Sequence, residues 1–321
     1  MKRFKNILYV AESGVIVKAF HHAVHLAETN NARLTLLMVM EPIPRYLNRL
    51  TPRMLKQARI RETEEALERL REWVANRLEV EPRVVEGDVF LEVIREVLRN
   101  ERDLVVKSAE GSDSALRWLF GTTDMHLLRK CPCPVWLFNS SEPTPIRRIM
   151  AAVDFNELDP SDGDSAEPLN RMILEMSGSL AHREQSEHHV VHAWKALGEY
   201  FMTSGRAGLN EEEVMSYLNE VQSKHRNWLD HLLDKGAEWL GPEIYDAIKP
   251  KTHLTAGHAR HIIPNLAREL KIDLIVMGTV ARTGIPGLII GNTAEAILNE
   301  IDCSVLAVKP PGFVSPVTLG D

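Results

Sequence analysis

The sequence contains little cysteine, no long hydrophobic run and no excess of positive charge. Its three cysteines, Cys131, Cys133 and Cys303, are too few for a disulfide framework and lack the ligand pairs of a zinc site. The apolar run Ile7–Ala11 ends at Glu12, which is too short for a signal peptide. No stretch approaches the ~20 apolar residues of a membrane span. We therefore expect a cytoplasmic protein without a membrane partner.

The charge balance argues against one further class of partner. Asp and Glu number 45 and Lys and Arg number 38, which gives a formal net charge of -7. Binding to nucleic acid depends on clustered basic residues that release counterions, so we expect no nucleic-acid partner. The length of 321 residues and the 44% hydrophobic content suit two domains, each with its own core.

The chain repeats itself. Residues 103–138 and 273–308 align without a gap, 170 positions apart. Identical pairs include Asp103 and Asp273, Leu104 and Leu274, Val106 and Val276, Gly121 and Gly291, Thr123 and Thr293, Cys133 and Cys303, and Val135 and Val305. Upstream, the segment 5–12 resembles 147–154. This pattern predicts a first domain over 1–141, a second over 146–312 and a C-terminal tail over 313–321.

Each copy alternates short apolar runs with helical patterns. The runs in the first copy are Ile7–Ala11, Leu34–Met40, Val84–Val85, Leu104–Val106 and Val135–Phe138. Continuous apolar runs are typical of buried parallel strands, and alternation with helices predicts an α/β, doubly wound parallel sheet in each domain. The second copy is longer around 155–168 and 196–213, which we interpret as loops.

A glycine-rich turn in the second copy carries the candidate chemistry. The strand ending at Gly278 leads through a loop to Gly291, Asn292 and Thr293, where a helix is expected to begin. Glycine lets backbone approach a phosphate closely, and the free N–H groups of a helix start bind anions. Ligands of open α/β sheets also bind at the carboxyl ends of strands. The turn therefore predicts a site for a small phosphorylated ligand.

This loop resembles the signature of the universal stress protein family, which reads Gly, two residues, Gly, nine residues, Gly, then Ser or Thr. Together with CPCPVW and KPPGFVSP, the chain is most similar to the family's tandem-domain E group. The resemblance implies a fold of the adenine nucleotide alpha hydrolase type, with strand order 3-2-1-4-5 in each domain. It also implies a non-catalytic stress-response role, including resistance to DNA damage, and ATP or AMP as cofactor.

The resemblance also implies the residues of the site. Asp154 would contact adenosine and Ala193 would offer its backbone to adenine, while the glycine-rich turn would hold the phosphates. The turn residues are Gly278, Thr279, Ala281, Arg282, Gly291, Asn292 and Thr293. The sequence departs from the signature where Ala281 replaces a glycine and Asn292 replaces a hydroxyl residue.

The first copy keeps different parts of the signature. Ser108, Gly111, Gly121 and Thr122 fall on its positions, but Glu12 replaces the aspartate at the end of the first strand. Further acidic residues follow in the same loop and helix: Glu110, Asp113 and Asp124. A like charge near a phosphate costs about 1 kcal/mol or more. We therefore expect one ligand site, in the C-terminal half.

Two other functions stay open at this point. One is a binding module for an apolar or acyl-bearing small molecule, with the insertion at 196–220 as a lid. Its lid residues would be Tyr200, Phe201, Met202, Met215 and Tyr217. The other is a weak ATPase, although no P-loop or nucleophile elbow occurs.

The sequence predicts no metal site and only one pairing, between the two domains. His258 and His261 share a spacing that could hold zinc, but no Cys or carboxylate partner stands at a firm distance, so no metal is predicted. The edges of the last strands, Val135–Phe138 and Val305–Val308, need covering. We expect the two domains to pair through them as an intramolecular pseudo-dimer, and a homodimer stays open.

Overall fold

The structure is a computed structural model, and it divides the chain into two compact units. The first consists of Met1–Thr144, Thr279–Gly291 and Ser304–Asp321, and the second of Pro145–Gly278 and Asn292–Cys303. The residues that the structure describes are 4–12, 15, 17–42, 52–110, 120–139, 145–155, 167–199, 202, 210–280 and 291–319. The predicted domain bounds divide the chain by repeat rather than by compactness, and they stay a prediction.

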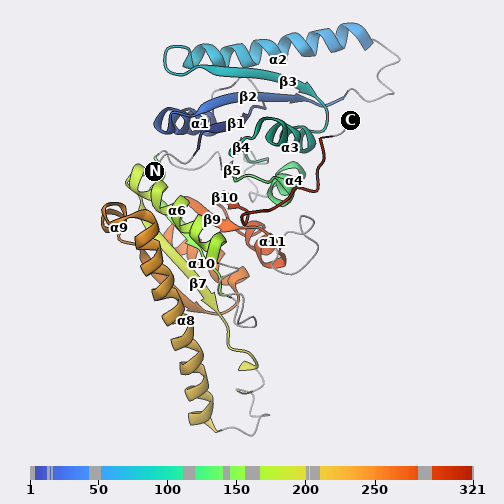
Figure 1. Ribbon diagram of the computed structural model, residues 1–321. Helices are drawn as coiled ribbons and strands as arrows, with labels where there is room; N and C mark the ends of the chain where they lie inside the picture. Colours follow the sequence, from blue (N-terminus) through green and yellow to red (C-terminus); the bar gives the residue numbers. More distant parts are fainter. Residues whose placement is uncertain are drawn as a thin grey trace. The chain divides into compact units, whose positions relative to one another are not determined.

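The first unit contains a parallel sheet with helices on both faces (Figure 1). Its strands are β1 Asn6–Val10, β2 Arg33–Met40, β3 Val80–Glu86, β4 Leu104–Ser108 and β5 Val135–Phe138. Its helices are α1 Lys18–Asn30, α2 Pro52–Val74, α3 Val89–Asn100 and α4 Thr122–Lys130. The strand order β3-β2-β1-β4-β5 is the predicted 3-2-1-4-5. The α/β fold is thus confirmed, with strands at the predicted apolar runs.

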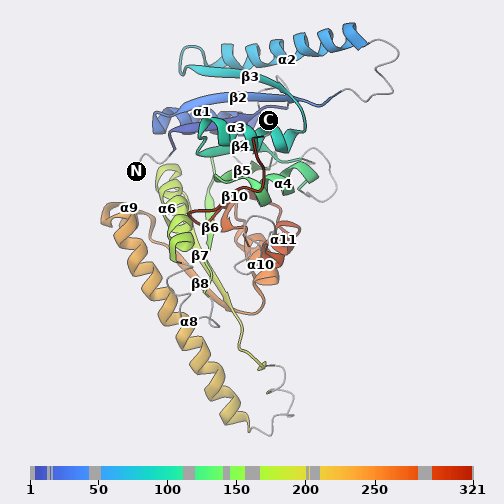
Figure 2. The same ribbon diagram turned by 45° about the vertical axis from the view of Figure 1, so that its right-hand side comes forward.

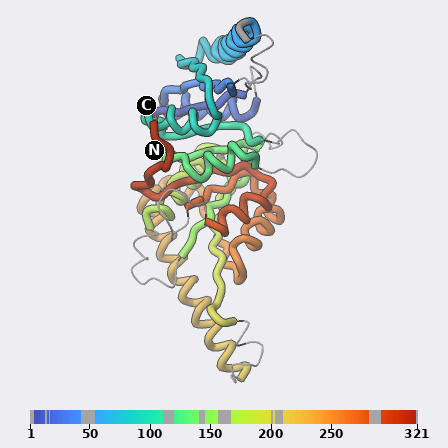
Figure 3. The backbone as a smooth tube through the Cα atoms, turned by 90° about the vertical axis from the view of Figure 1, so that its right-hand side faces the viewer, coloured from blue at the N-terminus to red at the C-terminus, as the bar shows by residue number. Residues whose placement is uncertain are grey.

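The second unit repeats this plan. Its strands are β6 Arg148–Ala152, β7 Glu187–Trp194, β8 Lys251–Ala256 and β9 Leu274–Gly278, in the parallel order β8-β7-β6-β9. Its helices are α6 Glu167–Glu184, α8 Glu211–Leu240, α9 Pro242–Ile248, α10 Ala259–Leu270 and α11 Asn292–Leu298. The helices α10 and α11 pack side by side (Figure 3).

Strand register confirms the repeat seen in the sequence. Ile7 of β1 pairs with Leu104 of β4, and Ile149 of β6 pairs with Leu274 of β9. Leu104 and Leu274 are matched residues of the two copies, so the same positions meet in both sheets. Equivalent residues of the two copies can therefore be compared one by one.

The last strand of the second copy, β10 Ser304–Val308, belongs to the first unit. It pairs antiparallel with β5, so that Leu306 lies opposite Trp136. Both strands are fully buried, and Ser304 Oγ accepts a hydrogen bond of 2.9 Å from the Asn139 amide. The two strand edges that the sequence left uncovered thus cover each other.

Helix α8 begins within the insertion of the second copy and continues beyond it. Asn210 accepts a 2.9 Å hydrogen bond from the Glu213 amide, and the Glu213 side chain accepts one of 2.8 Å from the Asn210 amide. This capping box starts the helix at Glu211, inside a segment interpreted as a loop. Figure 2 shows α8 continuing well past the strands of its own unit.

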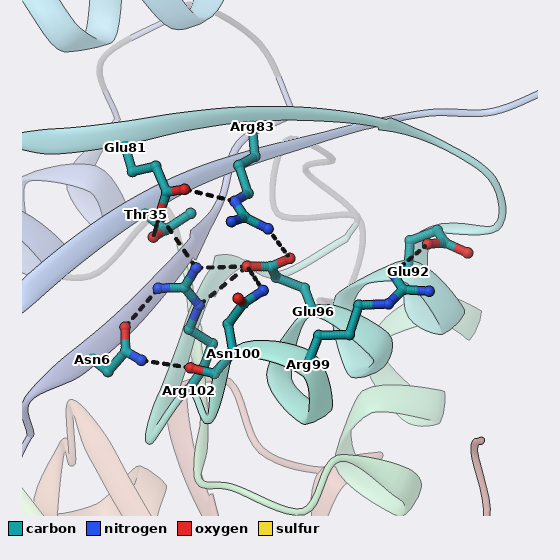
Figure 4. Close-up of polar contacts among 9 residues, drawn as sticks. All are labelled: Asn6, Thr35, Glu81, Arg83, Glu92, Glu96, Arg99, Asn100 and Arg102. Atoms are coloured by element: carbon teal, nitrogen blue, oxygen red, sulfur yellow. Dashed lines mark hydrogen bonds and ion pairs between the residues drawn. The ribbon is translucent and has the colours of Figure 1, made fainter. Parts of the chain in front are cut away.

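A buried ion pair joins α3 to the strands of the first unit (Figure 4). Arg102 donates to Glu96 Oε1 at 2.6 Å, and both side chains are only 4% exposed. Asn100 and Arg83 also donate to the Glu96 carboxylate, at 2.9 and 3.1 Å, and Arg102 donates to Asn6 at 2.6 Å. Because every charged group has partners, this network can be buried without an uncompensated charge.

Candidate functional site

The candidate site of the second unit lies at the carboxyl ends of three neighbouring strands. Ala152 of β6 pairs with Val191 of β7 on one side and with Met277 of β9 on the other. All three strands therefore end at one edge of the sheet. Asp154 follows β6 by two residues, Ala193 lies near the end of β7, and Gly278 ends β9. The structure thus brings these three predicted site residues to one sheet edge.

The backbone at Asp154 is held in place by α6. Asn170 Oδ1 accepts a hydrogen bond of 3.1 Å from the Asp154 amide, and Asn170 Nδ2 donates to the Asp154 carbonyl at 2.9 Å. Asn170 is buried, whereas the Asp154 side chain is exposed. The clamp fixes the backbone and leaves the Asp154 carboxylate at the surface.

A cavity of about 260 Å³ opens beside Asp154 at the end of β7. It is lined by Phe155, Ala193, Trp194, Lys195, Ala196, Leu197, Gly198 and His225. Of the predicted site residues, Ala193 lines this cavity and Asp154 directly precedes its first wall residue. Sequence reasoning missed the contribution of His225, because His225 lies in α8, beyond the insertion, and reaches the cavity only through packing.

The cavity wall is aromatic and held by ring contacts. Phe155 stacks on Trp228 with ring centroids 5.0 Å apart and meets His225 edge-on at 5.5 Å. His192 Nδ1 lies 3.3 Å from the Val153 carbonyl, and His192 Nε2 lies 2.8 Å from His225 Nδ1. A carbonyl can only accept, so neutral His192 donates from Nδ1 to Val153, and its Nε2 accepts a hydrogen bond from His225 Nδ1–H. This chain of bonds fixes the orientation of both rings.

The residues of the glycine-rich turn fall into three groups. Asn292 and Thr293 are exposed at the start of α11 in the second unit. Thr279 and Gly291 belong to the first unit, where the Gly291 amide donates to the Thr279 carbonyl at 3.2 Å. Ala281 and Arg282 lie outside the described residues.

The side chain of Thr279 has no exposed surface. Its hydroxyl donates to the Leu128 carbonyl at 2.9 Å and accepts a hydrogen bond from Lys309. The backbone of Thr279 is equally buried, because the residue as a whole is 0% exposed.

In the first unit, the equivalent positions are filled by charged side chains. Lys107 is 1% exposed and lies 2.5 Å from the Glu12 carboxylate and 3.1 Å from Asp124. Burial raises the pKa of Asp124 to about 6, against the lowering effect of Lys107. Burial works to lower the pKa of Lys107, but Asp124 and Glu12 outweigh it, so that pKa is raised. The second copy has Met277 at the position of Lys107 and Ala294 at that of Asp124.

The alternative lid is only partly within the described residues. Tyr217 donates to the Leu197 carbonyl at 3.0 Å and packs against the buried cluster of Trp194, Ala196 and Val221. Met215 is 56% exposed, and Tyr200 and Phe201 lie outside the described residues. Tyr217 is therefore held as part of a small core, and the lid stays a prediction.

Two further kinds of feature are absent from the described residues. Nowhere in this part of the chain do three His, Cys, Asp or Glu side chains gather as a metal site would require. None of the helices found there combines the length and the apolar character that crossing a membrane demands.

The fold and the strand-end cavity define a tandem α/β protein with a candidate small-molecule site. The model of the Universal stress protein family matches residues 3–139 and 145–309, so the chain belongs to this family. It is 30% identical over 234 residues to Universal stress protein E of Escherichia coli K12, covering 72% of this chain and 68% of that protein. It is 28% identical to the Haemophilus influenzae homologue, covering 67% and 64%.

Solved structures agree on the fold. A functionally unknown protein from Pseudomonas aeruginosa PAO1 is 23% identical, with a TM-score of 0.68 over 96% of this chain and 94% of that one. A universal stress protein from Archaeoglobus fulgidus is 15% identical, with a TM-score of 0.58 over 95% and 99%. At these identities the likeness concerns the fold.

Proposed function

We propose that the second repeat binds an adenine nucleotide or a similar phosphorylated ligand, and that the protein acts by binding rather than by catalysis. The observation that carries this proposal is the cavity at the end of β7, which is lined by Ala193 and by Phe155, the residue that follows Asp154. The family resemblance reached the same two residues from the sequence alone. The cavity and the resemblance are separate grounds for the same place.

The size and lining of the cavity favour a flat ring. Its volume of about 260 Å³ is smaller than the roughly 300–1,000 Å³ of sites that enclose a whole drug-sized ligand. The cavity therefore suits one ring system, with the rest of the ligand outside. Phe155 and His225 offer aromatic surface, which binds rings through offset or edge-on contacts. A nucleobase has this shape.

The sugar and phosphates would continue along the sheet edge. Asp154 exposes a carboxylate that can accept hydrogen bonds from ribose hydroxyls. Beyond it, Gly278 ends β9, and Asn292 and Thr293 are exposed where α11 begins. Ala294 stands where the first copy has Asp124, so this position adds no negative charge against a phosphate.

The test is calorimetric titration with ATP on four proteins. Asn292→Glu adds a negative charge at the proposed phosphate end, and we expect it to raise Kd about tenfold. Thr122→Glu is the matched control, because Thr122 is the equivalent exposed residue at the start of α4. Ala193→Phe fills the cavity and should weaken ATP and adenosine equally.

Two outcomes would contradict the proposal. Equal ATP affinity in the wild type, Asn292→Glu and Ala193→Phe would exclude this sheet edge as the site. Sustained phosphate release from ATP, lost in Asn292→Glu, would assign turnover in place of simple binding.

A further inference from the structure

The first repeat holds a carboxylate where the second would hold a phosphate. Glu110 Oε2 accepts a hydrogen bond of 3.3 Å from the Thr123 amide, in the first turn of α4. Amides in the first turn of a helix have no partner within the helix and carry its partial positive charge. Glu110 therefore satisfies a group that would otherwise bind an external anion.

The path of the chain around Gly121 is shaped to this side chain. A Cβ atom added to Gly121 would lie 1.6 Å from Glu110 Oε2 and 2.5 Å from Glu110 Cβ. The φ angle of Gly121 is -69°, which any residue can adopt. Glycine is thus required here for space rather than for backbone conformation, and the space is taken by Glu110.

A second contact holds Glu110 from its backbone. Asp124 Oδ2 accepts a hydrogen bond of 2.7 Å from the Glu110 amide. Asp124 is itself fully buried and lies 3.1 Å from Lys107, which also binds Glu12. Lys107 thus lies between two carboxylates, and the charge of Glu110 also acts on it to raise its pKa. The net negative charge of these four groups would repel a phosphate.

We propose that Glu110 is a built-in anion that closes the first repeat, so that phosphorylated ligands are confined to the second. The claim of a single ligand site rests on the function proposed above, but the Glu110 contact does not. The second copy has Val280 at the position of Glu110 and lacks the whole charged cluster except for Asp154. Glu110 is therefore the residue that sets how many sites the chain offers.

The first test requires no ligand. Amide hydrogen exchange is measured at Thr123 in the wild type, Glu110→Gln and Glu110→Val. Gln keeps an acceptor oxygen and should preserve most of the protection, whereas Val removes it and should speed exchange about tenfold. Glu79→Gln, at an exposed position outside the cluster, serves as the control. Unchanged exchange at Thr123 in Glu110→Val would overturn the proposal.

The second test counts sites with inorganic pyrophosphate and with ATP. The double variant Glu110→Val, Asp124→Ala reproduces Val280 and Ala294 of the second copy, and it should bind one anion more than the wild type. Asn292→Glu is added to silence the second repeat. If wild type binds no ATP, the proposed function fails, yet a gain of pyrophosphate binding in the double variant still supports closure by Glu110. No gain in a folded double variant, or two sites in the wild type, would overturn closure.

Discussion

The two copies share a fold but use the carboxyl edge of their sheets in opposite ways. In the first, Glu12, Lys107, Glu110 and Asp124 bind one another, and the edge is occupied by the protein's own charges. In the second, only Asp154 of this set is charged, and a cavity opens beside it. Duplication thus left one edge closed by internal ion pairs and one edge open. The difference indicates that a fold is kept by its apolar core while its site can change.

A similar contrast exists at the other end of the strands. The buried pair of Arg102 and Glu96 has apolar counterparts, Ile272 and Leu266, in the second copy. The same sheet can therefore be anchored either by a satisfied ion pair or by apolar packing. Removing one partner of the ion pair should destabilise the sheet, because the remaining charge would be buried without its main partner.

The largest effect is expected from breaking that pair. Glu96→Ala leaves the buried Arg102 guanidinium with only Glu81, a 52% exposed carboxylate 3.5 Å away, and should lower the free energy of unfolding of the first unit by about 3–5 kcal/mol. The double variant Glu96→Leu, Arg102→Ile copies the second repeat and should lose much less. Urea unfolding followed by hydrogen exchange of first-unit amides measures both. Equal losses in the two variants would show that the ion pair is not the source of the effect.

A smaller effect is expected at the end of β10, where Lys309 stands at the position of Asn139 in the first copy. Lys309 is 3% exposed and donates to the Leu128 carbonyl and the Thr279 hydroxyl. Burial lowers its pKa to about 7, well below the value of an unfolded lysine. Between pH 7 and 10 the unfolded chain therefore binds more protons, and the free energy of unfolding should rise with pH by about 3 kcal/mol.

Lys309→Met removes the titrating group and should flatten this rise. Lys18→Met, at an exposed lysine, should retain it. Chemical denaturation at pH 7, 8, 9 and 10 gives the slope for each protein. A slope that survives in Lys309→Met would assign the pH dependence to another group.

The smallest effect concerns the space beside Gly121. Gly121→Ala would force the Glu110 carboxylate away from the Thr123 amide and should cost about 1–2 kcal/mol. In a Glu110→Val background the same substitution should cost less, because the crowding oxygen is gone. Thermal unfolding of the four proteins completes this double-mutant cycle. Strictly additive losses would mean that Gly121 and Glu110 do not depend on each other.

Much of the fold could be predicted from the sequence, because its signals are local. Apolar runs such as Val135–Phe138 mark strands that are buried on both faces, and Asn292 stands where α11 begins. The start of α8 could also have been found, since Asn210 and Glu213 have the spacing of a capping box. The composition of this segment favours a loop, and only the spacing of Asn210 and Glu213 indicates the helix start.

The site could be predicted only in outline. The family resemblance implies Asp154 and Ala193 as site residues, and the structure places Ala193 in the cavity wall. His225 could not be predicted from the sequence. It lies in α8, 32 positions after Ala193, and only packing brings it to the end of β7. The burial of the Thr279 side chain could not be predicted either, because its partners Leu128 and Lys309 are remote in sequence.

The sequence by itself determined the duplication and the α/β class, because the apolar runs and the fixed repeat distance can be read along the chain, whereas the strand order was implied only by the family resemblance. The tertiary structure alone decided that β10 pairs antiparallel with β5, and that Glu110 rather than a ligand meets the start of α4. The physical reason is distance along the chain. A hydrogen bond or an ion pair depends on positions within a few tenths of an ångström, and for residues far apart in sequence only the folded backbone sets them.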